Sequence, residues 1–197
     1  IKLNLMEKLT GLKKIKTAVF ISGAGSNLKN IIRFSKIKRS PISVNLIISN
    51  TNKAKGLNFA NQFKIKKKIF GYKNAKLAEK KILILLEKEK IKLICLAGFM
   101  KILSKDFIKK FDGKIINIHP SLLPKYKGLN THAKAINNND KFAGCTVHYV
   151  TAKLDSGKTI LQKKVKITPR DNFTSLAKKV LKQEHKLYPA AIIKIFN

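Results

Sequence analysis

The stretch TAVFISGAGSN, residues 17–27, joins a short apolar run to a glycine-rich turn. The run Thr17–Ser22 has the length of a β-strand, and the glycines at 23 and 25 allow the tight turn that can open a helix behind it. Further apolar runs of strand length lie at residues 42–49, 92–99 and 114–119. Near-continuous hydrophobicity is typical of parallel strands that are covered on both faces.

The segments between these runs predict helices. Residues 75–90 carry Ala78, Ile82 and Leu86 at helical spacing, so a helix there has one apolar face. The runs at 142–150 and 158–167 follow one another without a helix and predict an antiparallel pair. We therefore expect an open α/β sheet that is mostly parallel, with helices on both faces and an antiparallel strand near the C-terminus.

Composition limits the possible functions. The 197 residues are 44% hydrophobic and carry a formal net charge of +33. Nearly all the cations are lysines, and the three arginines are Arg33, Arg39 and Arg170. Because nucleic-acid readers favour the forked guanidinium, this pattern favours a solvated basic surface that attracts anionic metabolites over a dedicated nucleic-acid site. A basic nucleic-acid-binding module remains the alternative from another class.

The chain reads as one domain, residues 16–197, preceded by a basic extension at residues 1–15. It shows no signal peptide and no apolar run of about 20 residues, so we expect a cytoplasmic protein that needs no membrane. Cys95 and Cys145 lie far apart without CxxC or histidine spacing, which argues against a disulfide framework or zinc site.

The turn after the first strand can bind an anion. The backbone amides of Gly25, Ser26 and Asn27 would face a guest at the positive end of a helix, and a phosphate suits that position. Position 28 is leucine, so the dinucleotide fingerprint GxGxxG is absent and NAD is disfavoured. An ordinary strand-to-helix turn would explain the motif equally well.

The run 114–119 ends in two polar side chains. Asn117 and His119 are two residues apart, so in a strand they project to one face, and Pro120 ends regular pairing. An amide donor beside a titratable imidazole suits acyl transfer, in which an oxyanion needs donors and an attacking amine must lose a proton. The alternative is a structural histidine.

A long helix closes the sequence, capped by Asp171 or Asn172. Its apolar stripe, which we expect to begin at Phe173, continues through Glu184. A carboxylate on an inward stripe costs free energy unless a partner satisfies it, so Glu184 is either a ligand group or a residue at the wet edge of the stripe.

Six separated motifs resemble the single-domain, folate-dependent phosphoribosylglycinamide formyltransferase family. They are FISGAGSNL (20–28), LAGFMKILS (96–104), NIHPSLLPKYKGLNTHAKAI (117–136), GCTVHYV (144–150), LDSGKTILQ (154–162) and QEHKLYP (183–189). The resemblance implies a Rossmann-like formyltransferase fold. It also implies transfer of the formyl group of 10-formyltetrahydrofolate, a cosubstrate, to the amine of glycinamide ribonucleotide in purine (IMP) biosynthesis, with no metal.

The resemblance also implies roles for individual residues. Asn117, His119 and Asp155 match the catalytic residues, with Asp155 as the carboxylate that keeps the imidazole protonated and relays a proton. Gly25, Ser26 and Asn27 would hold the substrate phosphate, and Glu184 the ribose hydroxyls. The folate would bind at Met100, Lys101, Ile102, Leu103 and Asn117, under a loop at residues 150–155. His132 and His148 match family positions and are expected to be structural or supporting.

Two positions depart from the family pattern. Lys101 and Ala75 stand where many relatives carry arginine. The folate glutamate tail would therefore lack the bidentate contact that a guanidinium gives, or would be bound by Lys73 or Lys76 instead. Methionyl-tRNA formyltransferase and formyltetrahydrofolate hydrolase remain related alternatives, although each usually has a further domain. We expect a monomer or weak homodimer without obligatory nucleic acid.

Overall fold

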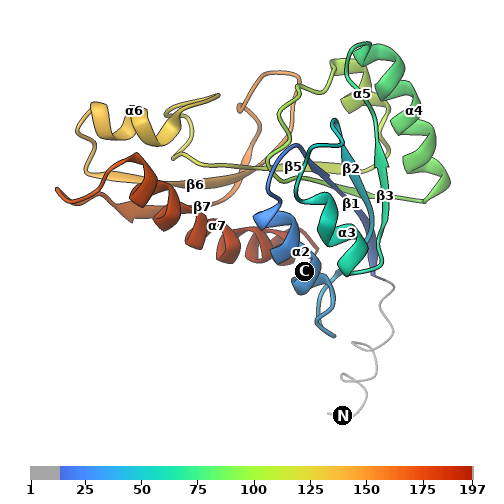
Figure 1. Ribbon diagram of the computed structural model, residues 1–197, viewed down its shortest axis with the longest axis horizontal. Coiled ribbons are helices and arrows are strands. Elements are labelled where there is room, and N and C mark those ends of the chain that lie inside the picture. Colours follow the sequence, from blue (N-terminus) through green and yellow to red (C-terminus); the bar gives the residue numbers. More distant parts are fainter. Residues whose placement is uncertain (1–13, 197) are drawn as a thin grey trace.

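The computed structural model describes residues 14–196, which form one seven-stranded sheet in the order β3-β2-β1-β4-β5-β6-β7 (Figure 1). The strands are β1 (Ile15–Ile21), β2 (Ile42–Ser49), β3 (Lys66–Ile69), β4 (Leu93–Leu96), β5 (Lys114–His119), β6 (Phe142–Tyr149) and β7 (Thr159–Lys166). The helices are α2 (Ser26–Ser35), α3 (Leu57–Gln62), α4 (Ala75–Lys88), α5 (Lys105–Lys110), α6 (Thr131–Asn137) and α7 (Phe173–Phe196).

Strand pairing confirms the expected fold class. The first five strands pair in parallel, whereas β6 runs antiparallel to both β5 and β7. The apolar runs predicted β1, β2, β5, β6 and β7 to within two residues, but β4 ends at Leu96, before the expected 99. The edge strand β3, with the sequence KKKI, was not predicted, because all four of its residues are exposed and give no hydrophobic signal.

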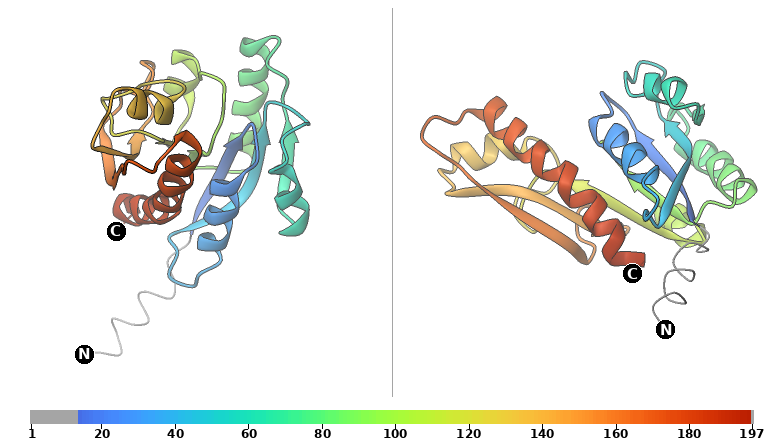
Figure 2. Two further views of the ribbon diagram at one scale, coloured as in Figure 1. Left: turned by 60° about the vertical axis from the view of Figure 1, so that its left-hand side comes forward. Right: turned by 90° about the horizontal axis from the view of Figure 1, so that it is seen from below.

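Helices cover both faces of the sheet, as expected. Apolar residues of α2, α3 and α7 pack in one core with the first face, while those of α4 and α5 pack in a second core with the other. Both views in Figure 2 show α7 running along the β6–β7 pair. Tyr188 of α7 is fully buried, and its hydroxyl donates to the carbonyl oxygens of Leu96 (2.9 Å) and Ile116 (3.2 Å). It thereby joins α7 to two neighbouring strands.

The order of the strands reverses between β1 and β4. The loops that follow these two strands therefore run in opposite directions at the carboxyl edge of the sheet. In open α/β sheets such a reversal is where ligands bind. The two loops are linked through Ser22, whose amide donates to Gly98 O (3.0 Å) and whose Oγ accepts from the Met100 amide (2.8 Å). The glycine loop and the segment 98–103 are therefore fixed to one another.

The first strand and the buried face of the last helix begin at positions other than those expected. Residues 1–13 of the proposed basic extension lie outside the described residues, and β1 already begins at Ile15. The expected start of the stripe on α7 is wrong: Phe173 is 65% exposed, and the buried stripe begins at Leu176.

Asn172 caps α7, since its Oδ1 accepts from the amides of residues 174 and 175. Among the helices described, none has the length and apolar character needed to cross a membrane.

Candidate active site

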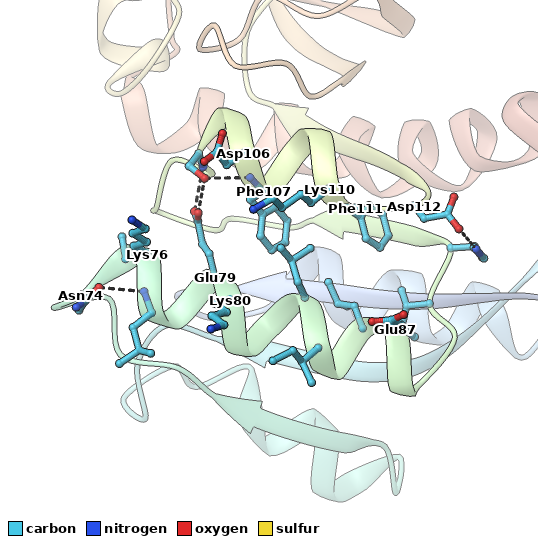
Figure 3. Close-up of a pocket in the computed structure, with 18 of the residues that line it drawn as sticks. Asn74, Lys76, Glu79, Lys80, Glu87, Asp106, Phe107, Lys110, Phe111 and Asp112 are labelled. Atoms are coloured by element: carbon cyan, nitrogen blue, oxygen red, sulfur yellow. Dashed lines mark hydrogen bonds and ion pairs between the residues drawn. The ribbon is translucent and has the colours of Figure 1, made fainter.

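A cleft of about 680 Å³ opens at the carboxyl edge of the sheet. It is lined by the predicted residues Asn27, Met100–Leu103, Asn117, His119, Asp155 and Glu184. A larger groove, about 1310 Å³, lies between α4 and α5 and contains none of them (Figure 3). There Glu79 is already satisfied by the amide of Ser104 at 2.9 Å and by its hydroxyl. We place the chemistry in the smaller cleft, because the reactive side chains converge there.

The last residues of β5 supply two of these side chains. Asn117 and His119 share one face of the strand, and β6 places His148 and Thr146 directly opposite them. His119 is 5% exposed and His148 is 2% exposed, while Asn117 is half-buried. Four polar side chains therefore form a two-by-two cluster where β5 ends.

His119 has a hydrogen-bond acceptor at each ring nitrogen. Its Nε2 lies 2.8 Å from the carbonyl oxygen of Tyr126, and its Nδ1 lies 3.4 Å from Asp155 Oδ2. A neutral imidazole carries one N–H and can satisfy only one of these acceptors, whereas the imidazolium satisfies both. The Nδ1–Oδ2 distance to Asp155 is longer than that of an ordinary hydrogen bond.

Asp155 reaches the cluster from the loop between β6 and β7. Its backbone is left-handed, with φ of 44°, and its side chain is 7% exposed. The amide of Gly128 donates to Oδ2 at 2.9 Å. Burial acts to raise the pKa of Asp155, but His148, the Gly128 amide and His119 together hold that pKa below its ordinary value. The side chain is therefore a carboxylate facing two histidines.

At the other end of the cleft Asn27 is part of the lining, whereas Gly25 and Ser26 are not among the lining residues. Gly25 caps α2 in a left-handed conformation, φ 76°, so the first amides of that ten-residue helix have no partner within the helix. Asn27 donates to Glu184 Oε2 at 2.6 Å, and its Oδ1 is buried without a protein partner among the residues described. Burial raises the pKa of Glu184, although Asn27 opposes the shift. The first amides of α2 and the Asn27 Oδ1 therefore remain available for hydrogen bonds with a polar ligand.

The segment Met100–Leu103 forms an apolar wall of the cleft. Met100 is 65% exposed and Ile102 69% exposed, which is unusual for large apolar side chains, whereas Leu103 is buried. Lys101 lies between them and is exposed. Ala75 is the first residue of α4 and lies in the α4/α5 groove, outside the cleft. The cleft thus pairs a polar end with an apolar end.

Groups outside the predicted catalytic trio also contact it. His148, expected to be a supporting residue, contacts both Asn117 (3.3 Å) and Asp155 (3.6 Å) through its Nε2. The alternation of Thr146 and His148 along β6 is a usable signal, since both share a face that the antiparallel pairing turns toward β5. The backbone groups of Tyr126 and Gly128 carry no such signal, because any residue supplies them.

The comparisons with known proteins agree with this geometry. The formyl transferase family pattern matches residues 15–192. A phosphoribosylglycinamide formyltransferase from Haemophilus influenzae is 42% identical over 180 residues, which cover 90% of this chain and 85% of that protein. The crystal structure of a phosphoribosylglycinamide formyltransferase from Brucella melitensis superposes with a TM-score of 0.88 at 40% identity, covering 93% of this chain and 96% of that one.

Longer proteins contain a similar sequence. The human "Trifunctional purine biosynthetic protein adenosine-3" is 40% identical over 183 residues, covering 91% of this chain but 18% of its own length. This chain thus spans 14–18% of the length of the trifunctional relatives that it matches. From the family pattern, the identity with relatives of similar length and the shared fold, the chain belongs to the formyl transferase family, in the group of the phosphoribosylglycinamide formyltransferases.

Proposed function

We propose that this chain transfers the formyl group of 10-formyltetrahydrofolate to the amine of glycinamide ribonucleotide, giving formylglycinamide ribonucleotide and tetrahydrofolate in purine synthesis. The observation that carries the proposal is the convergence of Asn117, His119 and Asp155 in one cleft. Asn27, at the N-terminal end of α2, lines one side of that cleft, and the segment Met100–Leu103 lines another. Family membership supports the same reaction.

The two ends of the cleft suit the two substrates. The phosphate of the ribonucleotide would accept from the amides of Gly25, Ser26 and Asn27 at the positive end of α2. Glu184, which is buried and accepts from Asn27 through Oε2, would also accept from the ribose hydroxyls. This arrangement places the amine of the glycinamide toward β5.

The folate would lie along the segment Met100–Leu103, with its ring against the exposed apolar side chains and the loop 150–155 over it. Lys101 would meet the negatively charged tail as a point charge. The formyl group on N10 would then reach Asn117, between the two substrates.

In the reaction the amine nitrogen attacks the formyl carbon, and the carbonyl oxygen becomes an oxyanion. Asn117 would donate an amide N–H to that oxygen, and the imidazole of His119, whose Nδ1 lies 3.4 Å from Asp155, would stabilise the same charge. The bond between the formyl carbon and N10 then breaks. The amine gives up one proton and N10 gains one.

Asp155 would act on both proton events. Its negative charge stabilises the imidazolium of His119, and it can accept the proton of the attacking amine through a water molecule. Its pKa is below the ordinary value, so it stays ionised at neutral pH. The three residues therefore act as one unit, and removal of any of them should lower turnover more than binding.

Several further features belong to the proposal. The formyl folate is consumed as a cosubstrate, and no metal takes part. The enzyme would work as a single domain, residues 16–197. We expect it in the cytoplasm, as a monomer or weak homodimer, and without a requirement for nucleic acid. Its basic surface would attract the two anionic substrates.

The proposal is tested with purified protein, glycinamide ribonucleotide and 10-formyldideazafolate or 10-formyltetrahydrofolate, following folate absorbance. We expect turnover that depends on both substrates. Parallel reactions with methionyl-tRNA, or with water as the only acceptor, test the related formyl transferases. Folate release at the same rate without the ribonucleotide would reject the proposed acceptor.

A further inference from the structure

His148 lies at the centre of contacts that the proposed reaction leaves unexplained. It is 2% exposed, it faces Asn117 across the β5–β6 pair, and its Nε2 lies 3.3 Å from Asn117 Nδ2. Its other ring nitrogen, Nδ1, lies 2.8 Å from the carbonyl oxygen of Tyr149. The ring also lines the cleft, although little of its surface is exposed.

The hydrogen-bond partners of His148 define its tautomer. A carbonyl oxygen only accepts, so Nδ1 must carry the hydrogen that it donates to Tyr149 O. Nε2 faces two groups, Asn117 Nδ2 at 3.3 Å and Asp155 Oδ1 at 3.6 Å, and only the amide lies within hydrogen-bond distance. A ring nitrogen without a hydrogen holds a lone pair and accepts from that amide. Asn117 Nδ2 is the donor within reach, and the amide can supply one of its two hydrogens to this acceptor.

This bond orients the amide of Asn117. Two hydrogens on one sp² nitrogen point in directions about 120° apart, so fixing the first fixes the second. An amide without such a partner can rotate about its last side-chain bond and present its oxygen instead. An oxygen aimed at a developing oxyanion would repel it, whereas an N–H stabilises it.

The strand itself is shaped around this residue. The pairing of β6 with β7 shifts register between Val147 and His148, which marks an irregularity at this position. Such irregularities re-aim side chains beside active sites. The backbone carbonyl that fixes the ring belongs to the next residue of β6, Tyr149. The end of this strand therefore both places the imidazole and selects its tautomer.

We propose that His148 is a positioning residue: its ring, fixed by the Tyr149 carbonyl, holds the Asn117 amide so that the remaining N–H faces the formyl oxygen. This inference rests on the proposed formyl transfer. It assigns His148 a role through Asn117 and predicts that the two residues act on the rate as a unit.

The test is a double-mutant cycle on kcat. Asn117→Ala should lower kcat about 100-fold, the usual cost of one lost oxyanion donor. His148→Leu, which keeps much of the volume but cannot accept, should lower kcat at least about tenfold, with the KM for glycinamide ribonucleotide within about twofold of the wild type. The double variant should be no slower than Asn117→Ala alone.

Two further variants separate positioning from structural support. His148→Gln offers an amide oxygen to the same N–H and should retain more activity than His148→Leu. Val147→Ala truncates a buried side chain on the opposite face of β6, so it should lower the melting temperature with kcat unchanged. If His148→Leu does not fold, the cycle is run with His148→Gln.

The outcomes are distinct. Additive losses in the double variant, or a His148→Leu enzyme with wild-type kcat, would overturn the positioning role while leaving formyl transfer intact. A wild-type protein that transfers no formyl group to glycinamide ribonucleotide would instead reject the proposed function. If His148→Leu and Val147→Ala lowered kcat equally, and in proportion to their melting temperatures, His148 would be a structural residue and the positioning role would be rejected.

Discussion

Replacing Gly25 by alanine probes the turn that shapes the anion-binding end of the cleft. Gly25 has φ of 76°, a left-handed conformation that costs an alanine about 1–2 kcal/mol. A Cβ built there lies 2.7 Å from the Cα of Gly56, well inside ordinary contact distance. Gly56 cannot easily retreat, because its amide donates to Gly23 O at 3.0 Å and its own Cα faces the side chain of Ile21.

The magnitude follows from these two costs. Relieving the close contact requires a backbone shift, and overpacking of this kind costs about 1–3 kcal/mol. Together with the strained conformation, Gly25→Ala should lose roughly 2–5 kcal/mol of folding free energy. For a chain of this size that lowers the melting temperature by roughly 5–15 °C. The first amides of α2 would move as well, so the KM for glycinamide ribonucleotide should rise more than that for the folate.

Gly23→Ala is the matched control. A Cβ at residue 23 meets no atom within 4 Å, so this variant should melt within about 1–2 °C of the wild type. Thermal denaturation by circular dichroism and calorimetric titration with glycinamide ribonucleotide measure the two effects. Equal melting temperatures for the two variants would refute the reasoning, since they would show that the contact with Gly56 carries no cost.

Three further predictions concern single polar groups. Asp155→Asn should lower kcat about 100-fold or more with little change in either KM, and steady-state kinetics over pH would check it. Burial raises the pKa of Glu184, so between its ordinary and raised values the folded protein holds a proton that the unfolded chain has released. Stability therefore falls as pH rises through that interval. Glu184→Gln should melt at a higher temperature than the wild type above that interval yet bind glycinamide ribonucleotide more weakly, as thermal scans and titrations across pH would show. Tyr188→Phe removes the hydroxyl that bonds Leu96 and Ile116, and should cost about 1–2 kcal/mol in denaturant unfolding with kcat unchanged.

Local sequence determined the strands and the first elements of the site. Six of the seven strands fall on the predicted runs, although β4 is shorter than its run, and burial on both faces explains why the parallel strands among them are apolar at nearly every position. The adjacency of Asn117 and His119 follows from the two-residue period of a strand, and the loop at 25–27 from glycine at a strand end. These features depend on residues near one another in the chain.

Roles for Asp155 and Glu184 came from family resemblance, because no local pattern connects them with the other site residues. Asn27 and Glu184, for example, are 157 positions apart and meet only because α7 packs beside α2. The edge strand β3 and the short helices α3, α5 and α6 escaped prediction because tertiary packing, and not a strong local pattern, stabilises them.

Only the tertiary structure decided which groups meet at the reacting centre. The antiparallel register places His148, and not its neighbours, opposite Asn117, and a slip of one residue would turn it to the other face of the sheet. The left-handed backbone at Asp155 and the amide of Gly128 bring a carboxylate to His119. Register and loop geometry are set by the free energy of the whole packed chain, so a stretch of sequence specifies its strand but not the partners of that strand.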